Sequence, residues 1–458
     1  MRRKKEPHEN KRRGLSLKPL IIGMSACVVL LGGVLLWAVL GSVRLEPESG
    51  HGLGIVDAVN TMGLQKKTQE LAAKPSAASS ESQTLTANET DAEEIKDKEA
   101  GDQKAEQTLE EESTKALAYQ QINEATMANS KSGVADVTQH EILARRNLEG
   151  ILDPITLKYG VITQNAAVRA FPTWKKASTS LDAHSFDYFQ ESMLMTGEAA
   201  VIVHQTADGI WSFVQAQNYR GWVETDKIAC CTLDELKKWQ ETKRAVVTDA
   251  RLTLAGTNVT LRMGTALPAK EESEGILMVS IPQKDDKGQL VITNVETTQD
   301  GIHYGYLDMT QENILDQAQK LFGMAYGWGD SNGDMDCSST MNAIYRCFGI
   351  ILPRNTGSMA QTGTQIVSLE GMTQEEKLEK IQSMKPGTLL VMKNHVVMYI
   401  GQENGEDLIL HNFTTCMAED GVSTKEVYQC QITQLNLVTA AGTQYLDAYA
   451  TAICFPED

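Results

Sequence analysis

An uncharged apolar run at residues 20–40 constrains this chain more than any other feature of its sequence. The run, LIIGMSACVVLLGGVLLWAVL, is long enough to cross a hydrocarbon core of about 30 Å as one helix. A soluble helix of this length normally has a polar face, and this segment has none. Lys and Arg crowd residues 1–19, so the positive-inside bias predicts a cytoplasmic tail there and an extracytoplasmic location for everything after Leu40.

Two other interpretations of this segment fit its sequence less well than an uncleaved anchor. A cleaved signal peptide usually has a shorter apolar core and a small-residue cleavage site, and no convincing site follows Leu40. A lipid attached at Cys27 would require the apolar run to precede that cysteine, whereas most of it follows. The sequence therefore favours a single-pass membrane protein.

Residues 41–150 have the composition of an acidic stalk. Acidic residues outnumber basic ones between 81 and 112, and aromatic residues are almost absent. Such a segment cannot bury enough apolar surface to offset its ordering entropy, so it is predicted to be a spacer. The formal net charge of the whole chain, −18, argues against a general nucleic-acid binder.

Two β-rich stretches follow the predicted stalk. In residues 151–231, the segments VITQNAAVRAFP, EAAVIVHQTADGIWSFVQAQ and YRGWVETDKIA have the pattern of short strands with turns between them. They resemble a bacterial SH3-like domain. A helical connector, DELKKWQETKR, leads to a second such stretch at 245–309, where Gly288 supplies a hairpin turn; it is predicted to be a second small SH3-like barrel.

Residues 310–458 are predicted to form an α+β domain. In ENILDQAQKLF, the apolar residues that share one helix face are Ile314, Leu315, Ala318, Leu321 and Phe322. A second helix begins at DCSSTMNAIYRCFG, and the strand-like runs GTLLVMKN, HVVMYIGQ and EDLILHNF come after it. Helices first and antiparallel strands later are typical of this fold class.

Cys337 is the candidate nucleophile. Asp336 is a good helix N-cap, which places Cys337 in the first turn, where the helix dipole is expected to lower the pKa of its thiol. A nucleophilic cysteine needs a base, and His395 and His411 are the two histidines that follow Cys337 in the chain. A hairpin between their strands would let His411 hold the imidazole of His395 in the correct tautomer.

Other chemistries find little support in the sequence. DSNGD at Asp330 has the alternating acids and amides of a calcium loop, but Met341 stands where the bidentate Glu is needed, so it is interpreted as a polar turn. No zinc-type spacing or phosphate loop is present, and neither a metal nor another cofactor is predicted. Cys347, Cys416, Cys430 and Cys454 are possible disulfide partners, without a preferred pairing.

Residues 312–413 resemble the NlpC/p60 family of bacterial cell-wall cysteine peptidases. The resemblance is carried by five segments in order: NILDQAQKLFGMAYGWG, DCSS, YRCFGIILPRNT, KPGTLLVMKNHVVMYIG and LILHNF. It implies a papain-like catalytic domain with the triad Cys337, His395 and His411, preceded by SH3-like domains. Ser339 stands where the family usually has Gly, and the segment between the two histidines is longer than usual.

The resemblance also implies contacts to the substrate. Family members that act on peptides with a free N-terminal L-Ala use residues that correspond to Tyr326, Asp336 and Ser338. Arg354 and Thr356, in the PRNT segment, would hold the carboxylate of D-Glu. A carboxylate suits an ammonium partner, and a guanidinium suits a carboxylate.

The leading hypothesis is therefore a peptidoglycan hydrolase that cleaves the γ-D-glutamyl–diamino acid bond of stem peptides. A papain-like amidase or acyltransferase is the first alternative, and a non-catalytic wall-binding protein is the second. The sequence makes no prediction of the oligomeric state, the diamino acid or the choice between endo- and exopeptidase action.

Overall fold

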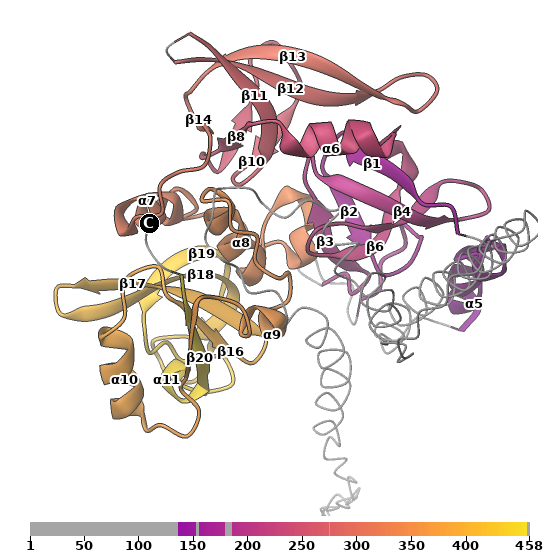
Figure 1. The fold of residues 1–458 in the computed structure, drawn as a ribbon. Coiled ribbons are helices and arrows are strands. Elements are labelled where there is room, and N and C mark those ends of the chain that lie inside the picture. Colours follow the sequence, from indigo (N-terminus) through magenta and orange to yellow (C-terminus); the bar gives the residue numbers. More distant parts are fainter. Residues whose placement is uncertain (1–135, 153–154, 179–185, 274, 456–458) are drawn as a thin grey trace, which may run out of the picture. The chain divides into compact units, whose positions relative to one another are not determined.

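The computed structural model describes residues 136–152, 155–178, 186–273 and 275–455, which all fall in one compact unit (Figure 1). The predicted transmembrane helix at 20–40 and most of the predicted stalk lie outside these residues. Across the part of the chain that is described, no helix combines the length and apolar character needed to cross a bilayer.

The first β domain is a seven-stranded antiparallel sheet with the strand order β3-β2-β6-β5-β4-β1-β7. Its strands are β1 (Lys158–Ile162), β2 (Ala166–Arg169), β3 (Gln190–Leu194), β4 (Ala199–Gln205), β5 (Trp211–Gln215), β6 (Arg220–Glu224) and β7 (Ile228–Cys231). The strand segments predicted from the sequence are confirmed. Strand β3 was not among them. The buried residues Ile162, Val168, Val214 and Val223 form one core beneath these strands.

Two helices flank this domain. Helix α5 (Asp136–Arg145) contacts it through Arg145, whose guanidinium lies 2.9 Å from the carboxylate of Asp208. Helix α6 (Leu233–Glu241) is the predicted connector, and a capping box between Thr232 and Glu235 begins it. The indole N–H of Trp239 donates to the carbonyl oxygen of Gly197 at 2.9 Å and so ties α6 to the first β domain.

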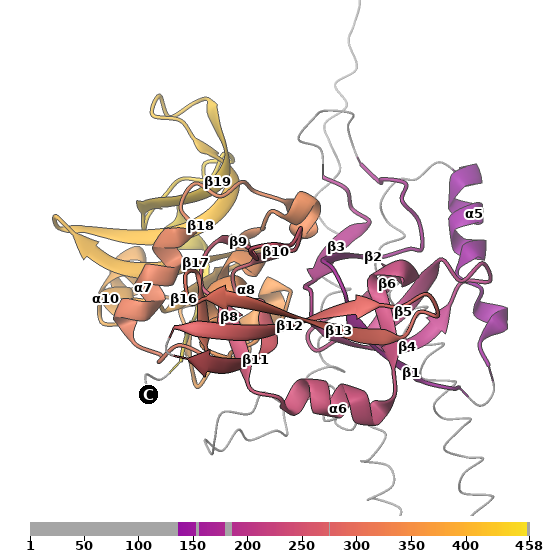
Figure 2. The same cartoon turned by 90° about the horizontal axis from the view of Figure 1, so that it is seen from above.

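The second β domain contains a five-stranded sheet of order β13-β12-β11-β8-β14 and a separate hairpin, β9–β10. The strands are β8 (Arg244–Val247), β9 (Arg251–Thr253), β10 (Thr260–Arg262), β11 (Ala266–Ser273), β12 (Ile276–Lys284), β13 (Leu290–Thr298) and β14 (Ile302–Tyr304). Figure 2 shows β12 and β13 as a long pair, and Gly288 has the predicted left-handed conformation in their turn, with φ of 79°. The SH3-like character of this domain stays a prediction.

The C-terminal domain is built on a six-stranded antiparallel sheet of order β15-β20-β16-β17-β18-β19. Its strands are β15 (Gln365–Ser368), β16 (Leu389–Met392), β17 (His395–Glu403), β18 (Glu406–Met417), β19 (Thr424–Gln434) and β20 (Tyr449–Cys454). Its helices are α7 (Gln311–Lys320), the short 3-10 segment η4 (Trp328–Gly333), α8 (Cys337–Arg346), α9 (Thr356–Met359), α10 (Gln374–Gln382) and α11 (Tyr445–Ala448).

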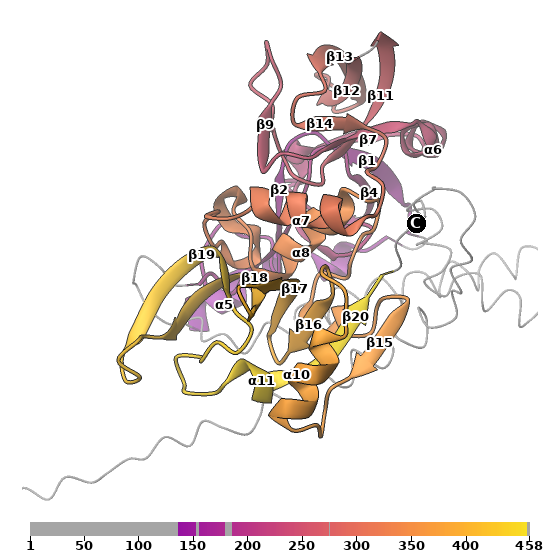
Figure 3. The same cartoon turned by 90° about the vertical axis from the view of Figure 1, so that its left-hand side faces the viewer.

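Helices cover both faces of this sheet (Figure 3). Alternate residues of the central strands face opposite sides, as the two-residue period of a strand requires. Leu389, Val391, Val396 and Met398 pack with α7 and α8, whereas Leu390, Val397, Tyr399 and Ile409 pack with α10 and α11. The α+β prediction for this domain is confirmed, and α8 is held rigidly against the sheet.

One residue of the predicted face of α7 was placed wrongly. Ile314, Ala318 and Leu321 are buried as expected and Leu315 is half-buried, but 53% of Phe322 is exposed. The helix ends at Lys320, so the helical period no longer applies at Phe322.

Candidate active site

Helix α8 places Cys337 at its first position. Asp336 is the N-cap, as predicted: its carboxylate accepts the backbone N–H of Ser339 at 3.0 Å. Ser339 returns the contact, because its hydroxyl accepts the backbone N–H of Asp336 at 2.9 Å. The side chain of Ser339 thus completes a capping box, which a glycine at that position would not provide.

The start of strand β17 lies against the thiol of Cys337. The backbone N–H of Val396 donates to the sulfur, and Val396 directly follows His395. Strands β17 and β18 form a tight hairpin through Asn404 and Gly405, whose φ values are 54° and 84°. This turn accommodates the longer segment between the two histidines and brings their side chains together, as the sequence predicted.

A chain of hydrogen bonds runs through the two imidazoles and beyond. Nε2 of His395 lies 3.0 Å from Nδ1 of His411, and Nε2 of His411 lies 3.1 Å from Oγ1 of Thr433. The hydroxyl of Thr433 donates to the carbonyl oxygen of Gln434 at 3.3 Å, so it accepts from His411. His411 therefore carries its proton on Nε2 and accepts at Nδ1, so His395 also carries its proton on Nε2. Nδ1 of His395 then has a lone pair that can accept a proton.

Aromatic rings fix the orientation of these imidazoles. Phe413 stacks on His411 with ring centroids 4.0 Å apart. Tyr445 packs edge-on against His395 and His411, with centroids 6.0 and 5.7 Å away. The phenol of Tyr445 also interacts electrostatically with the thiol of Cys337.

The protonation of this group differs from the sequence-based expectation. Burial, and next the carboxylate of Asp336, raise the pKa of the Cys337 thiol to about 12, against the lowering effect of the backbone N–H groups. Burial lowers the pKa of His395 to about 4, although Asp336 acts in the opposite direction. The resting pair is therefore a neutral thiol and a neutral imidazole, and not a preformed thiolate, because desolvation outweighs the helix terminus.

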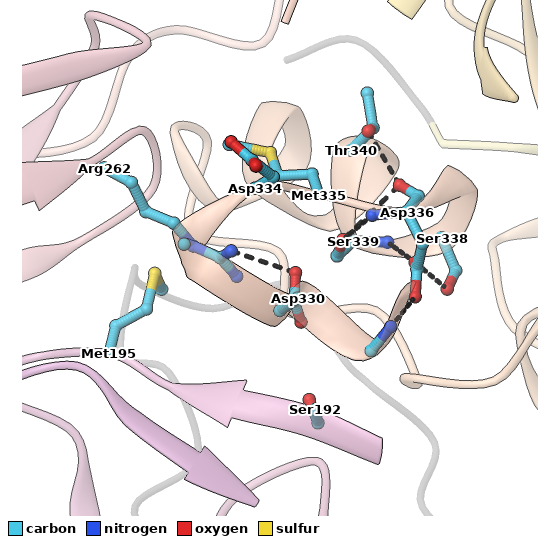
Figure 4. A network of polar contacts seen from close by, with 12 residues as sticks. Ser192, Met195, Arg262, Asp330, Asp334, Met335, Asp336, Ser338, Ser339 and Thr340 are labelled. Atoms are coloured by element: carbon cyan, nitrogen blue, oxygen red, sulfur yellow. Dashed lines mark hydrogen bonds and ion pairs between the residues drawn. The ribbon is translucent and has the colours of Figure 1, made fainter. Parts of the chain in front are cut away.

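Four buried charged side chains, Arg262, Asp330, Asp336 and Arg354, form a network next to Cys337. Figure 4 shows the pair of Arg262 and Asp330, and the contacts of Asp336 with Ser338 and Ser339. Nη2 of Arg354 lies 2.6 Å from Oδ2 of Asp336 and 3.4 Å from Oδ2 of Asp330. Arg262, from the second β domain, binds the other oxygen of Asp330 at 2.9 Å. Ser192, from the first β domain, accepts Nε–H of Arg354 at 2.9 Å. The network therefore joins all three domains.

The predicted substrate-contact residues fall into two groups. Ser338 and Arg354 belong to the charged network with Asp336, since the hydroxyl of Ser338 accepts from Arg354 at 2.7 Å. The resemblance implies that Asp336 binds an ammonium group of the substrate and that Arg354 binds a carboxylate. In the structure these two side chains pair with each other. Tyr326 lines a neighbouring pocket. Thr356 begins α9, and its side chain makes no hydrogen bond to this cluster among the described residues.

Sequence reasoning missed Asp330, Arg262 and Thr433 as parts of the site. The DSNGD segment is a turn, as interpreted, but only 3% of Asp330 is exposed, and its φ of 64° is unusual for a residue other than glycine. A buried carboxylate requires a cation beside it. The sequence of a polar turn does not indicate that Asp330 is buried, so it does not predict this cation. The alternating pattern of β19 indicates only that Thr433 lies in a strand, and not that it contacts His411.

No disulfide is present within the described residues, where all seven cysteines, Cys337 included, are free. The possible pairings among Cys347, Cys416, Cys430 and Cys454 are therefore not formed. In the same part of the chain, no group of three or more His, Cys, Asp or Glu side chains is arranged to hold a metal ion.

Comparison with known proteins gives two family matches along the chain. Residues 172–224 match the model of an SH3 domain of the SH3b1 type. Residues 323–436, which include the whole thiol and imidazole group, match the model of the NlpC/P60 family.

Two similar proteins support these matches. A gamma-D-glutamyl-L-lysine dipeptidyl-peptidase of Bacillus cereus is 27% identical over 94 residues, which is 20% of this chain and 27% of the relative's length. The solved structure of an NlpC/P60 endopeptidase from Photobacterium damselae subsp. piscicida shares the fold, with a TM-score of 0.61 and 22% identity; the match covers 74% of this chain and 83% of that one. The chain thus carries an NlpC/P60 domain at residues 323–436, preceded by an SH3 domain of the SH3b1 type at residues 172–224.

Proposed function

We propose that this protein is a cysteine peptidase that hydrolyses the γ-D-glutamyl bond to a diamino acid in peptidoglycan stem peptides. The observation that carries the proposal is the arrangement of a thiol at the first position of α8 beside the start of β17, with His395 backed by His411 and Thr433. The name of the Bacillus cereus relative supports the choice of bond.

The proposed reaction begins with general-base transfer. As the sulfur of Cys337 attacks the carbonyl carbon, its proton moves to Nδ1 of His395, because a neutral thiol and a neutral imidazole are the resting forms. The backbone N–H of Cys337 stabilises the oxyanion. The C–N bond then breaks, His395 returns the proton to the leaving amine, and a thioester remains. Water, activated by His395, releases the acid and restores the thiol.

We further propose that residues 20–40 anchor the protein in the cell membrane, with residues 1–19 in the cytoplasm. The apolar run and the basic residues before it support this orientation. The peptidase domain would then face the cell wall, where its substrate lies.

Digestion of purified muropeptides by the full-length chain tests this function. The expected products, identified by mass spectrometry, are fragments that end in D-Glu and fragments that begin with the diamino acid. Cleavage of a different amide bond would instead establish an amidase, and transfer of the acyl group to an added amine would establish an acyltransferase. Binding to cell walls without any cleavage would contradict an enzymatic role.

The pH profile of kcat/KM is expected to have its acid limb near pH 4, well below the ordinary histidine pKa of about 6.5. His395 must be neutral to accept the proton, and it is neutral above its lowered pKa, so activity should persist at pH 5–6 and fall toward pH 4. Initial rates at low substrate concentration measure this pKa, and circular dichroism at each pH controls for unfolding. An acid limb at 6.5 in folded enzyme would contradict the burial of His395.

Thr433→Val is expected to lower kcat/KM by about tenfold, because valine leaves the Nε2–H of His411 without an acceptor. The hydrogen-bond chain then no longer fixes the tautomer of His395. Thr433→Ser keeps the hydroxyl and should retain at least half of the activity. The pH profiles of both variants separate this positioning role from a packing defect, since only loss of the acceptor should move the acid limb. Equal losses in both variants, with unchanged profiles, would show that Thr433 acts only by packing.

A further inference from the structure

The short segment η4, which lies just before the nucleophile helix, has a strained backbone. Four of its residues have left-handed φ values: Gly329 at 60°, Asp330 at 64°, Asn332 at 59° and Gly333 at 75°. Residues other than glycine seldom adopt this conformation, so contacts from outside the segment must hold it. The backbone N–H of Gly329 donates to Oδ2 of Asp336 at 3.2 Å. The shape of η4 therefore affects the residue directly before Cys337.

Two arginines of the second β domain contact this segment from one hairpin. Arg251 in β9 and Arg262 in β10 are register partners, so their side chains leave the same face of the hairpin. Arg262 binds the carboxylate of Asp330 at 2.9 Å (Figure 4). Arg251 binds the carboxylate of Asp334, the residue after η4, at 2.6 Å. Like charges that face each other across a strand pair repel, so these two carboxylates stabilise the hairpin as well as η4.

The inner of these two ion pairs belongs to the buried network. The side chains of Arg262 and Asp330 are 9% and 1% exposed, whereas those of the outer pair are 44% and 23% exposed. Asp330 also lies 3.4 Å from Nη2 of Arg354, which binds Asp336 at 2.6 Å. Asp330 thus lies between two arginines. Because a buried carboxylate needs a cation, loss of Arg262 should draw Arg354 away from Asp336.

We propose that Arg262 is a positioning residue, through which the second β domain keeps the pair of Arg354 and Asp336 in the geometry that binds the substrate. This inference rests on the proposed function and gives the second β domain a part in the active site. Asp336 and Ser338 are among the residues that the sequence resemblance assigns to the substrate, and Arg354 binds both. The capping box of α8 involves neither arginine, so Cys337 should stay in place without Arg262. Loss of Arg262 should therefore weaken substrate binding more than the chemical step.

Steady-state kinetics of the full-length chain on muropeptides test this role. Arg262→Met should raise KM by about tenfold and change kcat by less than about threefold. Adding Asp330→Asn removes the carboxylate that draws Arg354 away, so KM should return to within about threefold of that of the unaltered chain. Arg346→Met is the matched control, because it breaks another ion pair between domains, 2.6 Å from Glu198 at the far end of α8. This control should leave KM unchanged.

A rise in KM that Asp330→Asn does not reverse would overturn the proposal, as would an equal rise in KM with Arg346→Met. Unchanged kinetics of Arg262→Met would also overturn it. A lower kcat at unchanged KM would show that Arg262 only stabilises the fold, because partial unfolding reduces the amount of active enzyme without changing its affinity. If Arg262→Met does not fold, Arg262→Gln takes its place with the same expectations.

Failure of the unaltered chain to cleave muropeptides would refute the proposed function instead. The free energies of unfolding of Arg262→Met, Asp336→Asn and the double variant would then decide whether the two positions are linked. Distant positions that share no partner have additive effects on stability. Non-additive effects would therefore support the link through Asp330 and Arg354, and additive effects would refute it.

Discussion

Cys337→Ala is expected to lower kcat/KM for muropeptides by about 10⁴-fold or more while the chain keeps its fold. Alanine removes the only atom that can form the thioester, and no other nucleophile replaces it at the first position of α8. The capping box between Asp336 and Ser339 does not involve the sulfur, so α8 should still begin at residue 337. Loss of activity should therefore occur without a comparable loss of stability.

Product formation followed by mass spectrometry, together with the thermal unfolding midpoint, measures both parts of this expectation. Cys347→Ala is the matched control, because Cys347 is a buried cysteine at the other end of the same helix, and its thiol donates to the carbonyl oxygens of Val247 and Ala343. This control should lose some stability and keep its activity. Normal turnover by Cys337→Ala would refute the thiol mechanism.

Much of the active-site group could be predicted from local patterns. An N-cap such as Asp336 fixes the start of a helix within one or two residues, so the position of Cys337 follows from the residues around it. Strand alternation and a short hairpin likewise bring His395 and His411 together, because neighbouring strands in a hairpin have a defined register. These inferences depend on residues near one another in the chain.

The charged network could not be predicted in this way, because its partners are far apart in sequence. Ser192 and Arg354 are separated by 162 positions, and Arg262 and Asp330 by 68. The protonation of Cys337 was also predicted wrongly for a global reason. The helix terminus is a local feature that favours a thiolate, but the burial that raises the pKa of the thiol results from packing against the whole domain.

Arg354→Met is expected to destabilise the protein by about 3–5 kcal/mol, because it leaves a buried carboxylate without its cation. Methionine fills a similar volume, so lost charge rather than lost packing should dominate. The shift of the urea unfolding midpoint of the full-length chain measures the effect. Arg251→Met is the matched control: Arg251 pairs with Asp334 at 2.6 Å near the same turn, but 44% of its side chain is exposed, so its loss should cost less than about 1 kcal/mol.

The pH dependence of this loss identifies its cause. In the native chain burial opposes the charge of Asp336, but Arg354 and the surrounding donors outweigh it and lower the pKa of Asp336, so its contribution to stability is present above pH 4 and is lost as pH falls. Without Arg354, burial should raise this pKa above its unfolded value, and the variant should regain stability on acidification. The difference between the two proteins should therefore narrow between pH 7 and pH 4.

Adding Asp336→Asn to Arg354→Met removes both charges and should recover part of the loss at pH 7. If the double variant is no more stable than Arg354→Met alone and the difference does not change with pH, packing rather than the unpaired charge explains the destabilisation.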